Sequence, residues 1–355
     1  MIRVEREKSL KSDSWVSYIM ENDILLRVKD LHTHFFTEDG VVKAVDGVNL
    51  FVRRGKTLGV VGESGCGKSM TALSILRLID PPGKVVKGEM LFKGQDLLAL
   101  SENRMRRIRG NSISMIFQDP MTALNPVLTI GDQLSEVLLV HQKMTPRSAR
   151  AAVVDMLGRV GITDPAKRFE QYVHTLSGGI QQRAMIAMAL LCKPDLLLAD
   201  EPTTALDVTI QAQILELMRK IQGEFGTSIL FITHDLGVIA ELAHDIVVMY
   251  AGKVVESADV RELFRNPLHP YTRDLLRCLP RLDSEETELF TIQGMAPGPF
   301  EAVCGCDFHI RCRHARDICK KSAPPLVEIS PGHLSACWMD REVKEPAGHS
   351  TSEGS

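Results

Sequence analysis

The chain has 355 residues, of which 44% are hydrophobic and 25% charged, and a formal net charge of −3. This length suggests about two domains and a core that needs no disulfides or metals to fold. The composition excludes a disordered or low-complexity chain, and the near-neutral charge provides no basic field for nucleic acid. No apolar run reaches the roughly 18 residues that a membrane span requires.

The two ends of the chain carry no pattern of packed structure. Residues 1–21 mix charged and apolar side chains, without the apolar centre of a secretory signal. We expect residues 1–23 to be a flexible extension, with Met20 as an alternative start, and residues 341–355 to be a disordered tail. The absence of a signal favours a reducing compartment, in which cysteines remain thiols.

The first patterned segments indicate strands. Residues 24–52 are rich in β-branched side chains and contain a turn signal at Asp39 and Gly40. Short apolar runs of the buried-strand type follow at residues 57–61, 195–199 and 228–232.

Helical patterns lie between the short strands, over residues 70–78, 134–160 and 210–223. Alternation of strands and helices predicts an α/β core with a largely parallel sheet. Residues 119–174 have helical patterns without strands, which predicts a helical insert. Prolines, cysteines and histidines become frequent after residue 266, where we place a domain boundary.

A phosphate-binding pattern follows the run at residues 57–61. Residues 62–69 read Gly-Glu-Ser-Gly-Cys-Gly-Lys-Ser and match G-x-x-x-x-G-K-[ST], between a predicted strand and a predicted helix. The glycines let backbone N–H groups face phosphate oxygens, and the helix N-terminus favours anions. Lys68 would neutralise the β- and γ-phosphates, and the Ser69 hydroxyl would ligate Mg²⁺. The alternative is a glycine-rich turn without a ligand.

Two adjacent carboxylates, Asp200 and Glu201, end the strand predicted at residues 195–199. The C-terminal edge of a parallel sheet is where ligands bind in open α/β folds. We expect Asp200 to reach Mg²⁺ through water and Glu201 to act as a general base on an attacking water. Without a phosphate loop upstream, the pair would equally be a solvated strand end.

A second helix N-terminus suited to anions begins at Ser177. This serine is a good N-cap, Gly178 and Gly179 permit close backbone approach, and a helix is predicted over residues 180–191. Because this helix has no nucleotide-binding strand of its own, it suggests capping of a γ-phosphate that another subunit holds. A capped surface helix without a ligand is the alternative.

The order of these segments resembles the nucleotide-binding domain of an ABC transporter over residues 24–264. The resemblance implies an α/β fold: a P-loop ABC ATPase core with a mostly parallel sheet, an antiparallel β subdomain and a helical subdomain at about residues 119–180. It implies a cassette over residues 24–265 and a small cysteine-containing C-terminal extension over residues 266–340.

The same resemblance implies roles for single residues. Glu201 would be the catalytic base, His234 the switch histidine that holds the γ-phosphate, and Gln118 a residue that senses Mg²⁺ and contacts the membrane subunit. Mg²⁺ would be held by Ser69, Gln118 and Asp200. Phe35 lies where the family places an aromatic ring on adenine, although Phe36 is adjacent and either ring could be core. The implied nucleotide contacts are Phe35, Gly62, Ser64, Gly65, Cys66, Gly67, Lys68, Ser69, Met70, Gln118, Ser177, Gly178, Gly179, Gln181, Asp200 and Asp207.

Three stretches, residues 62–69, 116–126 and 266–272, narrow the resemblance to the ATP-binding subunits of oligopeptide/dipeptide importers. This implies an ATP-hydrolysing motor on the cytoplasmic side of the cell membrane that drives uptake of di- or oligopeptides. The implied partners are a second ATP-binding subunit, which in this family is often a non-identical paralogue, two membrane permease subunits and an external solute-binding protein, with no nucleic acid.

Other functions remain open at this point. Carriers of nickel, glutathione and oligosaccharides belong to the same subfamily, so the solute is not fixed. A soluble ABC ATPase acting on nucleic acid or ribosomes is the runner-up, although such proteins usually carry two nucleotide domains or long inserts. An exporter half would need fused membrane spans.

Five of the eight cysteines lie in the extension, at positions 304, 306, 312, 319 and 337. Thiolates suit Zn²⁺ or an iron–sulfur cluster, and these spacings are wider than in zinc knuckles. The resemblance implies a [4Fe–4S] cluster on Cys306, Cys312, Cys319 and Cys337, with Zn²⁺ or metal-free packing as alternatives. Cys304 is excluded because it is too close to Cys306 to ligate comfortably.

Polar neighbours of these cysteines have two possible uses. Three histidines could replace a thiolate, and three arginines could offset the charge of a cluster or form a solvated face; they are His309, His314, His333, Arg311, Arg313 and Arg316. We expect the cofactor to be structural, because nothing in the sequence places it near the phosphates.

Overall fold

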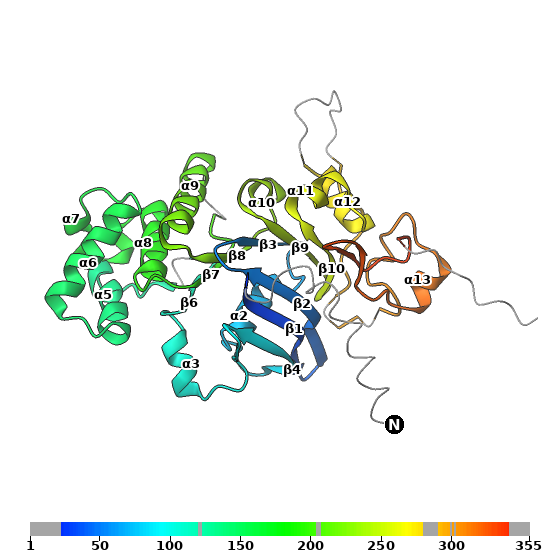
Figure 1. Ribbon diagram of the computed structural model, residues 1–355, viewed down its shortest axis with the longest axis horizontal. Coiled ribbons are helices and arrows are strands. Elements are labelled where there is room, and N and C mark those ends of the chain that lie inside the picture. The colour runs from blue at the N-terminus through cyan, green and yellow to red at the C-terminus, as the bar shows by residue number, and fades with distance from the viewer. Residues whose placement is uncertain are drawn as a thin grey trace, which may run out of the picture.

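The structure is a computed structural model that describes residues 23–119, 123–203, 207–279, 290–298, 300–301 and 303–340. The expected N-terminal extension, apart from residue 23, and the expected tail lie outside the described residues. Two sheets and the helices that surround them make up the described part of the chain (Figure 1). In this part, no helix is long and apolar enough to cross a membrane.

The larger sheet has the strand order β11-β12-β10-β9-β3-β8-β7-β6. Its parallel half is formed by β6 (Ile113–Ile116), β7 (Leu196–Asp200), β8 (Ser228–Ile232), β3 (Thr57–Val61) and β9 (Asp245–Tyr250). All residues of β3, β7 and β8 are buried, as expected for parallel strands covered on both faces. The three strands predicted from short apolar runs are therefore confirmed, and they lie side by side.

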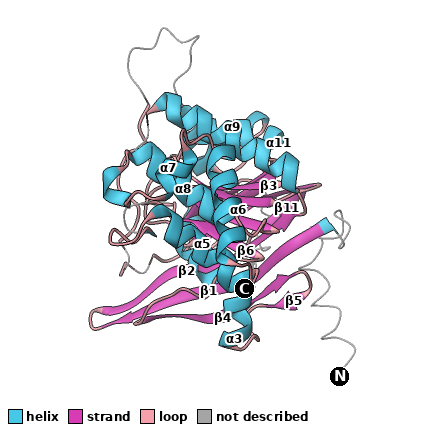
Figure 2. Cartoon of the chain, turned by 90° about the vertical axis from the view of Figure 1, so that its left-hand side faces the viewer, coloured by secondary structure: helices cyan, strands magenta, loops and turns pink. Residues whose placement is uncertain are grey.

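The smaller sheet is antiparallel, in the order β2-β1-β4-β5. A long hairpin of β1 (Ile24–Thr37) and β2 (Gly40–Arg53) turns at the predicted Asp39-Gly40 position, and β4 (Gly83–Phe92) and β5 (Gln95–Asp96) complete the sheet. Figure 2 shows its long strands running together below most of the helices.

Helices that follow the phosphate loop and β5 are short. α2 (Lys68–Ile75) begins in the loop and ends three residues before the predicted limit. The reason is Arg77, which adopts a left-handed backbone with φ 54° and sends its guanidinium to the carbonyls of Leu97 and Leu100. α3 (Glu102–Ile108) then leads to β6.

The predicted helical insert is confirmed in the described residues. It contains α5 (Ile130–His141), α6 (Pro146–Arg159), α7 (Pro165–Phe169), a 3₁₀ turn (Val173–Thr175) and α8 (Gly178–Leu190), which gather at one end of the molecule (Figure 1). Threonine caps begin two of them: Thr129 accepts the N–H of Asp132, and Thr145 accepts that of Ser148.

Two hydrophobic cores lie on opposite faces of the larger sheet. Alternate residues of β7 enter them: Leu197 and Ala199 pack with the helical insert, α9 (Val208–Phe225) and α10 (Leu236–Leu242), whereas Leu196 and Leu198 pack with α2 and the antiparallel sheet. The larger sheet therefore joins the two halves of the cassette.

The C-terminal extension continues the larger sheet. After β10 (Lys253–Asp259) and α11 (Val260–Arg265) come α12 (Pro270–Arg277), α13 (Asp317–Lys321), β11 (Val327–Ser330) and β12 (His333–Ser335). β12 pairs antiparallel with β10, and β11 pairs with β12. The extension is thus hydrogen-bonded to the cassette sheet, at the end of the molecule opposite the helical insert (Figure 1).

Candidate active site

The phosphate loop, residues 62–69, lies between β3 and α2 and needs glycine at two positions. Gly62 has φ 153° and Gly67 has φ 98°. A Cβ atom would stand 2.2 Å from the carbonyl oxygen of Met249 at the first position and 2.3 Å from that of Ala44 at the second. Larger residues are therefore excluded both by backbone conformation and by contact.

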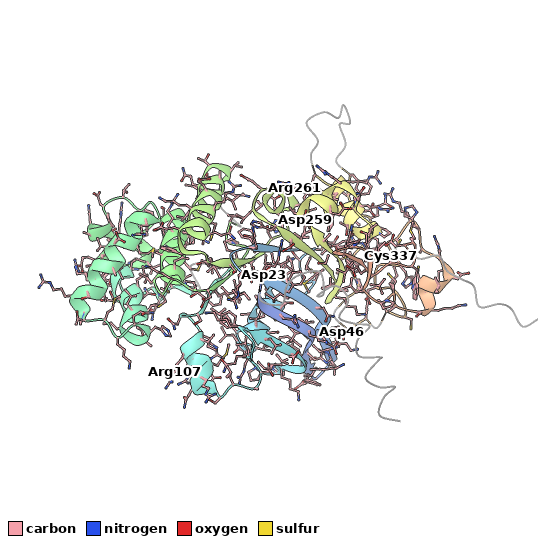
Figure 3. All side chains as sticks on the ribbon, in the orientation of Figure 1. Asp23, Asp46, Arg107, Asp259, Arg261 and Cys337 are labelled. Atoms are coloured by element: carbon pink, nitrogen blue, oxygen red, sulfur yellow. The ribbon has the colours of Figure 1, made fainter. Side chains whose placement is uncertain are left out.

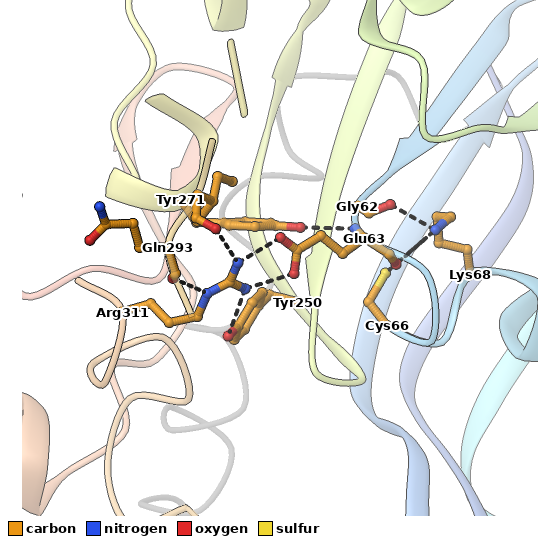
Figure 4. Close-up of polar contacts among 9 residues, drawn as sticks. Gly62, Glu63, Cys66, Lys68, Tyr250, Tyr271, Gln293 and Arg311 are labelled. Atoms are coloured by element: carbon orange, nitrogen blue, oxygen red, sulfur yellow. Dashed lines mark hydrogen bonds and ion pairs between the residues drawn. The ribbon is translucent and has the colours of Figure 1, made fainter. Parts of the chain in front are cut away.

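Lys68 lies across this loop with a side chain that is almost fully buried. Its Nζ donates to the carbonyl oxygens of Gly62 at 2.7 Å and Glu63 at 3.0 Å (Figure 4). These are bonds that an ammonium group can exchange for phosphate oxygens.

The other loop residues divide by exposure. Ser64 and Gly65 are exposed, whereas Cys66 is buried behind the loop and burial raises the pKa of its thiol. Cys66 can therefore face a nucleotide only through its backbone. Met70, in the first turn of α2, is half-buried.

Two expected Mg²⁺ ligands lie together where β7 ends and α2 begins. The Ser69 hydroxyl donates to a carboxylate oxygen of Asp200 at 2.9 Å. Burial raises the pKa of Asp200, and this hydrogen bond acts in the opposite direction. Two oxygen ligands beside the phosphate loop suit a hard cation such as Mg²⁺.

The three expected catalytic residues follow three adjacent parallel strands: Gln118 after β6, Glu201 after β7 and His234 after β8. The structure brings them together. One Glu201 carboxylate oxygen lies 3.3 Å from the Gln118 amide nitrogen and 3.3 Å from Nδ1 of His234. Gln118 contacts Glu201 here, and no contact of its amide with Ser69 or Asp200 is seen.

Glu201 itself is buried, with 8% of its surface exposed, and has φ 45°. Its N–H donates to the carbonyl oxygen of Ile232 on the neighbouring strand at 2.9 Å. A left-handed backbone is unfavourable for glutamate and is kept where surrounding contacts fix it, often at functional sites. The carboxylate is thus held at the sheet edge.

The second anion-binding helix begins as predicted, but its side chains differ from expectation. Ser177 is at the N-cap of α8 without a side-chain capping bond, and it is exposed together with Gly178. Gly179 is half-buried. Gln181 was expected to contact ATP, yet its amide is buried and donates to the carbonyls of Val173 and Leu176. A side chain committed to its own loop cannot also face a nucleotide, so that expectation is corrected for this conformation.

Two expected nucleotide contacts, Phe35 and Asp207, lie outside the phosphate loop. Phe35 is half-buried, and its ring closes over Gly83, whereas Phe36 is 44% exposed with Lys84 Nζ 4.8 Å from its ring centroid. The packing favours Phe36 as the ring open to a base. Asp207 caps α9 by accepting the N–H of Ile210, and residues 204–206 before it lie outside the described part.

Four cysteines of the extension line one small cavity, namely Cys306, Cys312, Cys319 and Cys337, together with His269, His309 and His314. Figure 3 places Cys337 at the end of the molecule opposite the helical insert. Cys304 is exposed and is absent from the lining, as the sequence suggested. His333 is not in the lining either, because it is buried against Glu256 at 2.8 Å.

The cysteine cavity is small and apolar in character. Burial, together with nearby Cys319, raises the pKa of the Cys306 thiol to about 11, and burial likewise raises that of Cys337 to about 11. In the described residues, no three of these sulfurs lie within 4.8 Å of one another. A single Zn²⁺, with Zn–S bonds of about 2.3 Å, would hold its thiolates about 4 Å apart.

One group of possible metal ligands was missed from the sequence. His32, His34 and Asp46 bring ligand atoms within 4.8 Å of one another on the β1–β2 hairpin. The His32 ring nitrogens are engaged by the carboxylates of Asp30 and Asp46, at 2.9 and 3.0 Å. Strand pairing of His32 with Asp46 produces this cluster, and no local sequence motif marks it.

Arg311, for which two uses were open, is absent from the lining of the cysteine cavity, and only 4% of its side chain is exposed, so it is not part of a solvated face. Its guanidinium instead pairs with Glu63 of the phosphate loop, at 2.7 and 2.9 Å (Figure 4). The fold therefore brings part of the extension to the phosphate loop, while the structural role expected of a cofactor at the cysteines stays a prediction. The one signal in the sequence was the His-Pro-Tyr-Thr segment, residues 269–272 within the stretch 266–272, because its tyrosine, Tyr271, contacts the same loop residue.

Comparison with known proteins agrees with this geometry. The family model for ABC transporters matches residues 45–204, and the model for the C-terminal region of oligopeptide/dipeptide transporters matches residues 255–319. A probable peptide ABC transporter ATP-binding protein of Sinorhizobium fredii is 53% identical, with 90% of this chain and 96% of the relative covered.

Two further relatives are similar over almost their whole length. A dipeptide transport ATP-binding protein of Bacillus subtilis is 51% identical over 91% of this chain and 97% of its own. An oligopeptide transport ATP-binding protein of Escherichia coli is 49% identical over 90% of this chain and 94% of its own.

Solved structures confirm the predicted cassette fold. A dimeric bacterial ABC transporter cassette superposes with a TM-score of 0.61 at 27% identity, over 66% of this chain and 99% of its own. A post-hydrolysis form of that cassette, bound to ADP and inorganic phosphate, gives the same values. The chain therefore belongs to the ATP-binding proteins of the oligopeptide/dipeptide type of ABC transporter, a family of ATPases that couple ATP hydrolysis to transport.

Proposed function

We propose that this protein is the ATP-hydrolysing subunit of an importer that takes up di- or oligopeptides, bound peripherally at the cytoplasmic face of the cell membrane. The observation that carries the ATPase part is the meeting of Gln118, Glu201 and His234 beside the phosphate loop. The peptide part is supported by relatives of about 50% identity that are named as peptide, dipeptide and oligopeptide transport proteins.

The hydrolytic step follows from the positions of these side chains. The loop N–H groups and Lys68 bind the phosphates of ATP, and His234 contacts the γ-phosphate. Glu201 accepts a proton from water as the water oxygen bonds to the γ-phosphorus, while the bond from that phosphorus to the oxygen of ADP breaks. Ser69 and Asp200 would hold Mg²⁺, which offsets charge on the phosphate oxygens.

A second ATP-binding subunit would complete the site. Ser177 and Gly178 are exposed at the start of α8, so they are available to the γ-phosphate of a partner. The solved bacterial cassette to which this chain is similar is dimeric. The further partners in this proposal are two membrane permease subunits, contacted near Gln118, and an external solute-binding protein.

The cysteine cavity is proposed to hold a [4Fe–4S] cluster. Four thiols from separate segments of the extension line it, and among the described residues no three of their sulfurs lie as close together as a single zinc ion requires. His309 and His314 also line the cavity, so a mixed ligand set is the nearest alternative, with Zn²⁺ or metal-free packing as the others. Because a metal binds thiolates, its binding would have to displace the protons that the raised pKa values keep on these thiols.

Solute accumulation in cells tests the proposal. Cells that depend on this protein, compared with cells carrying Glu201→Gln, are given labelled dipeptide, pentapeptide, nickel, glutathione and an oligosaccharide. Loss of peptide uptake alone supports the proposal. Loss of nickel, glutathione or sugar uptake with peptide uptake unaffected would show that the transported solute is not a peptide. Unchanged uptake of all five would favour an ATPase without a transport role.

A further inference from the structure

Arg311 of the extension forms a partly buried ion pair with the phosphate loop. Its two terminal nitrogens donate to the two carboxylate oxygens of Glu63, at 2.7 and 2.9 Å, and its Nε donates to the carbonyl oxygen of Gln293. Only 4% of the arginine side chain is exposed. A bidentate contact of this kind fixes the orientation of the carboxylate as well as its distance. The ammonium group of a lysine would not fix the orientation.

Tyr271 holds the same loop residue from α12. The Glu63 N–H donates to the Tyr271 hydroxyl oxygen at 2.9 Å, and the tyrosine has no exposed surface. Its ring packs against Tyr250 and Phe308, with centroids 4.7 and 5.3 Å away. The tyrosine of the His-Pro-Tyr-Thr segment therefore reaches the phosphate loop from a rigid aromatic cluster.

Glu63 links these contacts to the phosphate-binding lysine. Its carbonyl oxygen accepts a hydrogen bond from Lys68 Nζ at 3.0 Å, while its N–H and carboxylate are held by the extension (Figure 4). All three polar groups of Glu63 are thus engaged. Loss of the contacts from Tyr271 or Arg311 would therefore release Glu63, and with it the carbonyl oxygen to which Lys68 donates.

We propose that Tyr271 and Arg311 are positioning residues for ATP binding, which act through Glu63 to hold the phosphate loop in its binding conformation. This deepens the ATP site without depending on whether the cysteine cavity holds metal. It also gives the His-Pro-Tyr-Thr segment a role that neither catalysis nor the sheet pairing of the extension explains.

A purely structural brace between the two parts is the competing account, and it makes a different prediction. Weakening a brace lowers the melting temperature and the fraction of folded sites, but folded sites keep their affinity. Weakening a positioning contact lowers the affinity for ATP equally in the ground state and in the transition state. KM for ATP therefore rises while kcat is retained. Titration calorimetry separates the two, because it reports the number of sites and their Kd independently.

The test uses the purified full-length chain with Mg²⁺ and a non-hydrolysable ATP analogue. Tyr271→Phe, which removes one hydroxyl, is expected to raise Kd about fivefold, and Arg311→Lys about tenfold, on the scale of one neutral and one charge-assisted hydrogen bond. Tyr172→Phe and Arg316→Lys, both exposed, are matched controls and should stay within twofold.

A third comparison tests whether Glu63 is the intermediary. Once Glu63→Gln is present, adding Arg311→Lys should change Kd by less than twofold. Kd values within twofold of wild type for both Tyr271→Phe and Arg311→Lys would overturn the proposal, whatever happens to the melting temperature. If Arg311→Lys does not fold, the Kd of Tyr271→Phe alone decides.

Discussion

At the scale of single residues, the proposed function assigns proton transfer during hydrolysis to Glu201. It is buried with a left-handed backbone, and Gln118 and His234 lie against one carboxylate oxygen. Glu201→Gln keeps the size of the side chain but cannot accept a proton. We expect Mg-ATP binding to remain within threefold and hydrolysis to fall by about 10²–10⁴-fold, the usual share of a general base.

Calorimetry with Mg-ATP and a phosphate-release assay check this prediction together. Glu216→Gln, on the exposed face of α9, is a matched control and should hydrolyse ATP like wild type. Turnover of Glu201→Gln within a few-fold of wild type would show that another group accepts the proton.

The cysteines allow a second residue-scale prediction. Cys304 is exposed outside the cavity and Cys312 lines it, so Cys304→Ser should retain bound metal and Cys312→Ser should lose it. Anaerobic purification with iron, sulfide and zinc analysis and a visible spectrum gives the result. Iron and sulfide in near-equal amounts would identify a cluster, and zinc without colour a zinc site. Metal lost from Cys304→Ser but kept in Cys312→Ser would contradict the ligand set.

At the scale of elements, the start of α12 is sensitive to acid. His269 caps this helix by accepting the N–H of Tyr271 on Nδ1, and complete burial lowers its pKa to about 4. In the unfolded chain the pKa of this histidine is near 6.5. Between pH 4 and 6.5 the unfolded chain therefore binds more protons at His269 than the folded protein does. Stability therefore rises with pH through this window and is lost as pH falls, by about 2 kcal/mol at pH 5.

His269→Asn should remove that part of the pH dependence. Asparagine is among the best N-cap residues and can accept the same N–H, but it does not titrate. Urea unfolding at pH 5 and pH 7.5 measures the difference, with exposed His174→Asn as the control. An equal loss of stability on acidification in wild type and His269→Asn would contradict the role of this histidine.

Elements set by a local apolar pattern could be predicted from the sequence, and elements set by tertiary pairing could not. β3, β7 and β8 were predictable because strands buried on both faces are continuously apolar. The pairing of β12 with β10 was not, since three residues carry too little pattern and the contact is entirely tertiary.

The candidate site divides in the same way. Lys68, Asp200 and Glu201 lie in local motifs, so their sequence context identified them. The inward turn of Gln181 and the pairing of Arg311 with Glu63 depend on neighbours far along the chain or on the packing of one loop. From charge and position alone, Arg311 could belong to a cluster site or to a solvated face, whereas the fold brings it to Glu63 of the phosphate loop.

At the scale of the whole molecule, the account predicts that each ATP site needs two subunits. Ser177→Arg, at the exposed start of α8, should leave ATP binding by the same chain's Lys68 intact and block hydrolysis at the partner's loop. Mixed dimers test this in the assembled transporter. If Ser177→Arg and Lys68→Ala lie on different subunits, one site carries both lesions and the other is intact. About half of the activity should then remain, whereas lesions on the same subunit should impair both sites.

A strictly monomeric preparation should hydrolyse ATP poorly for the same reason. Transporter-like turnover by a monomer, or full activity with Ser177→Arg on every subunit, would contradict completion of the site in trans.

Peptide uptake into sealed vesicles tests the central claim most directly. The full transporter is reconstituted with Mg-ATP on the side of this subunit and a labelled dipeptide with the solute-binding protein on the other. The account predicts uptake against a concentration gradient that requires ATP and falls to background with Glu201→Gln on every copy of this subunit. Peptide accumulation at the wild-type rate with Glu201→Gln, or none with the wild-type chain, would contradict it.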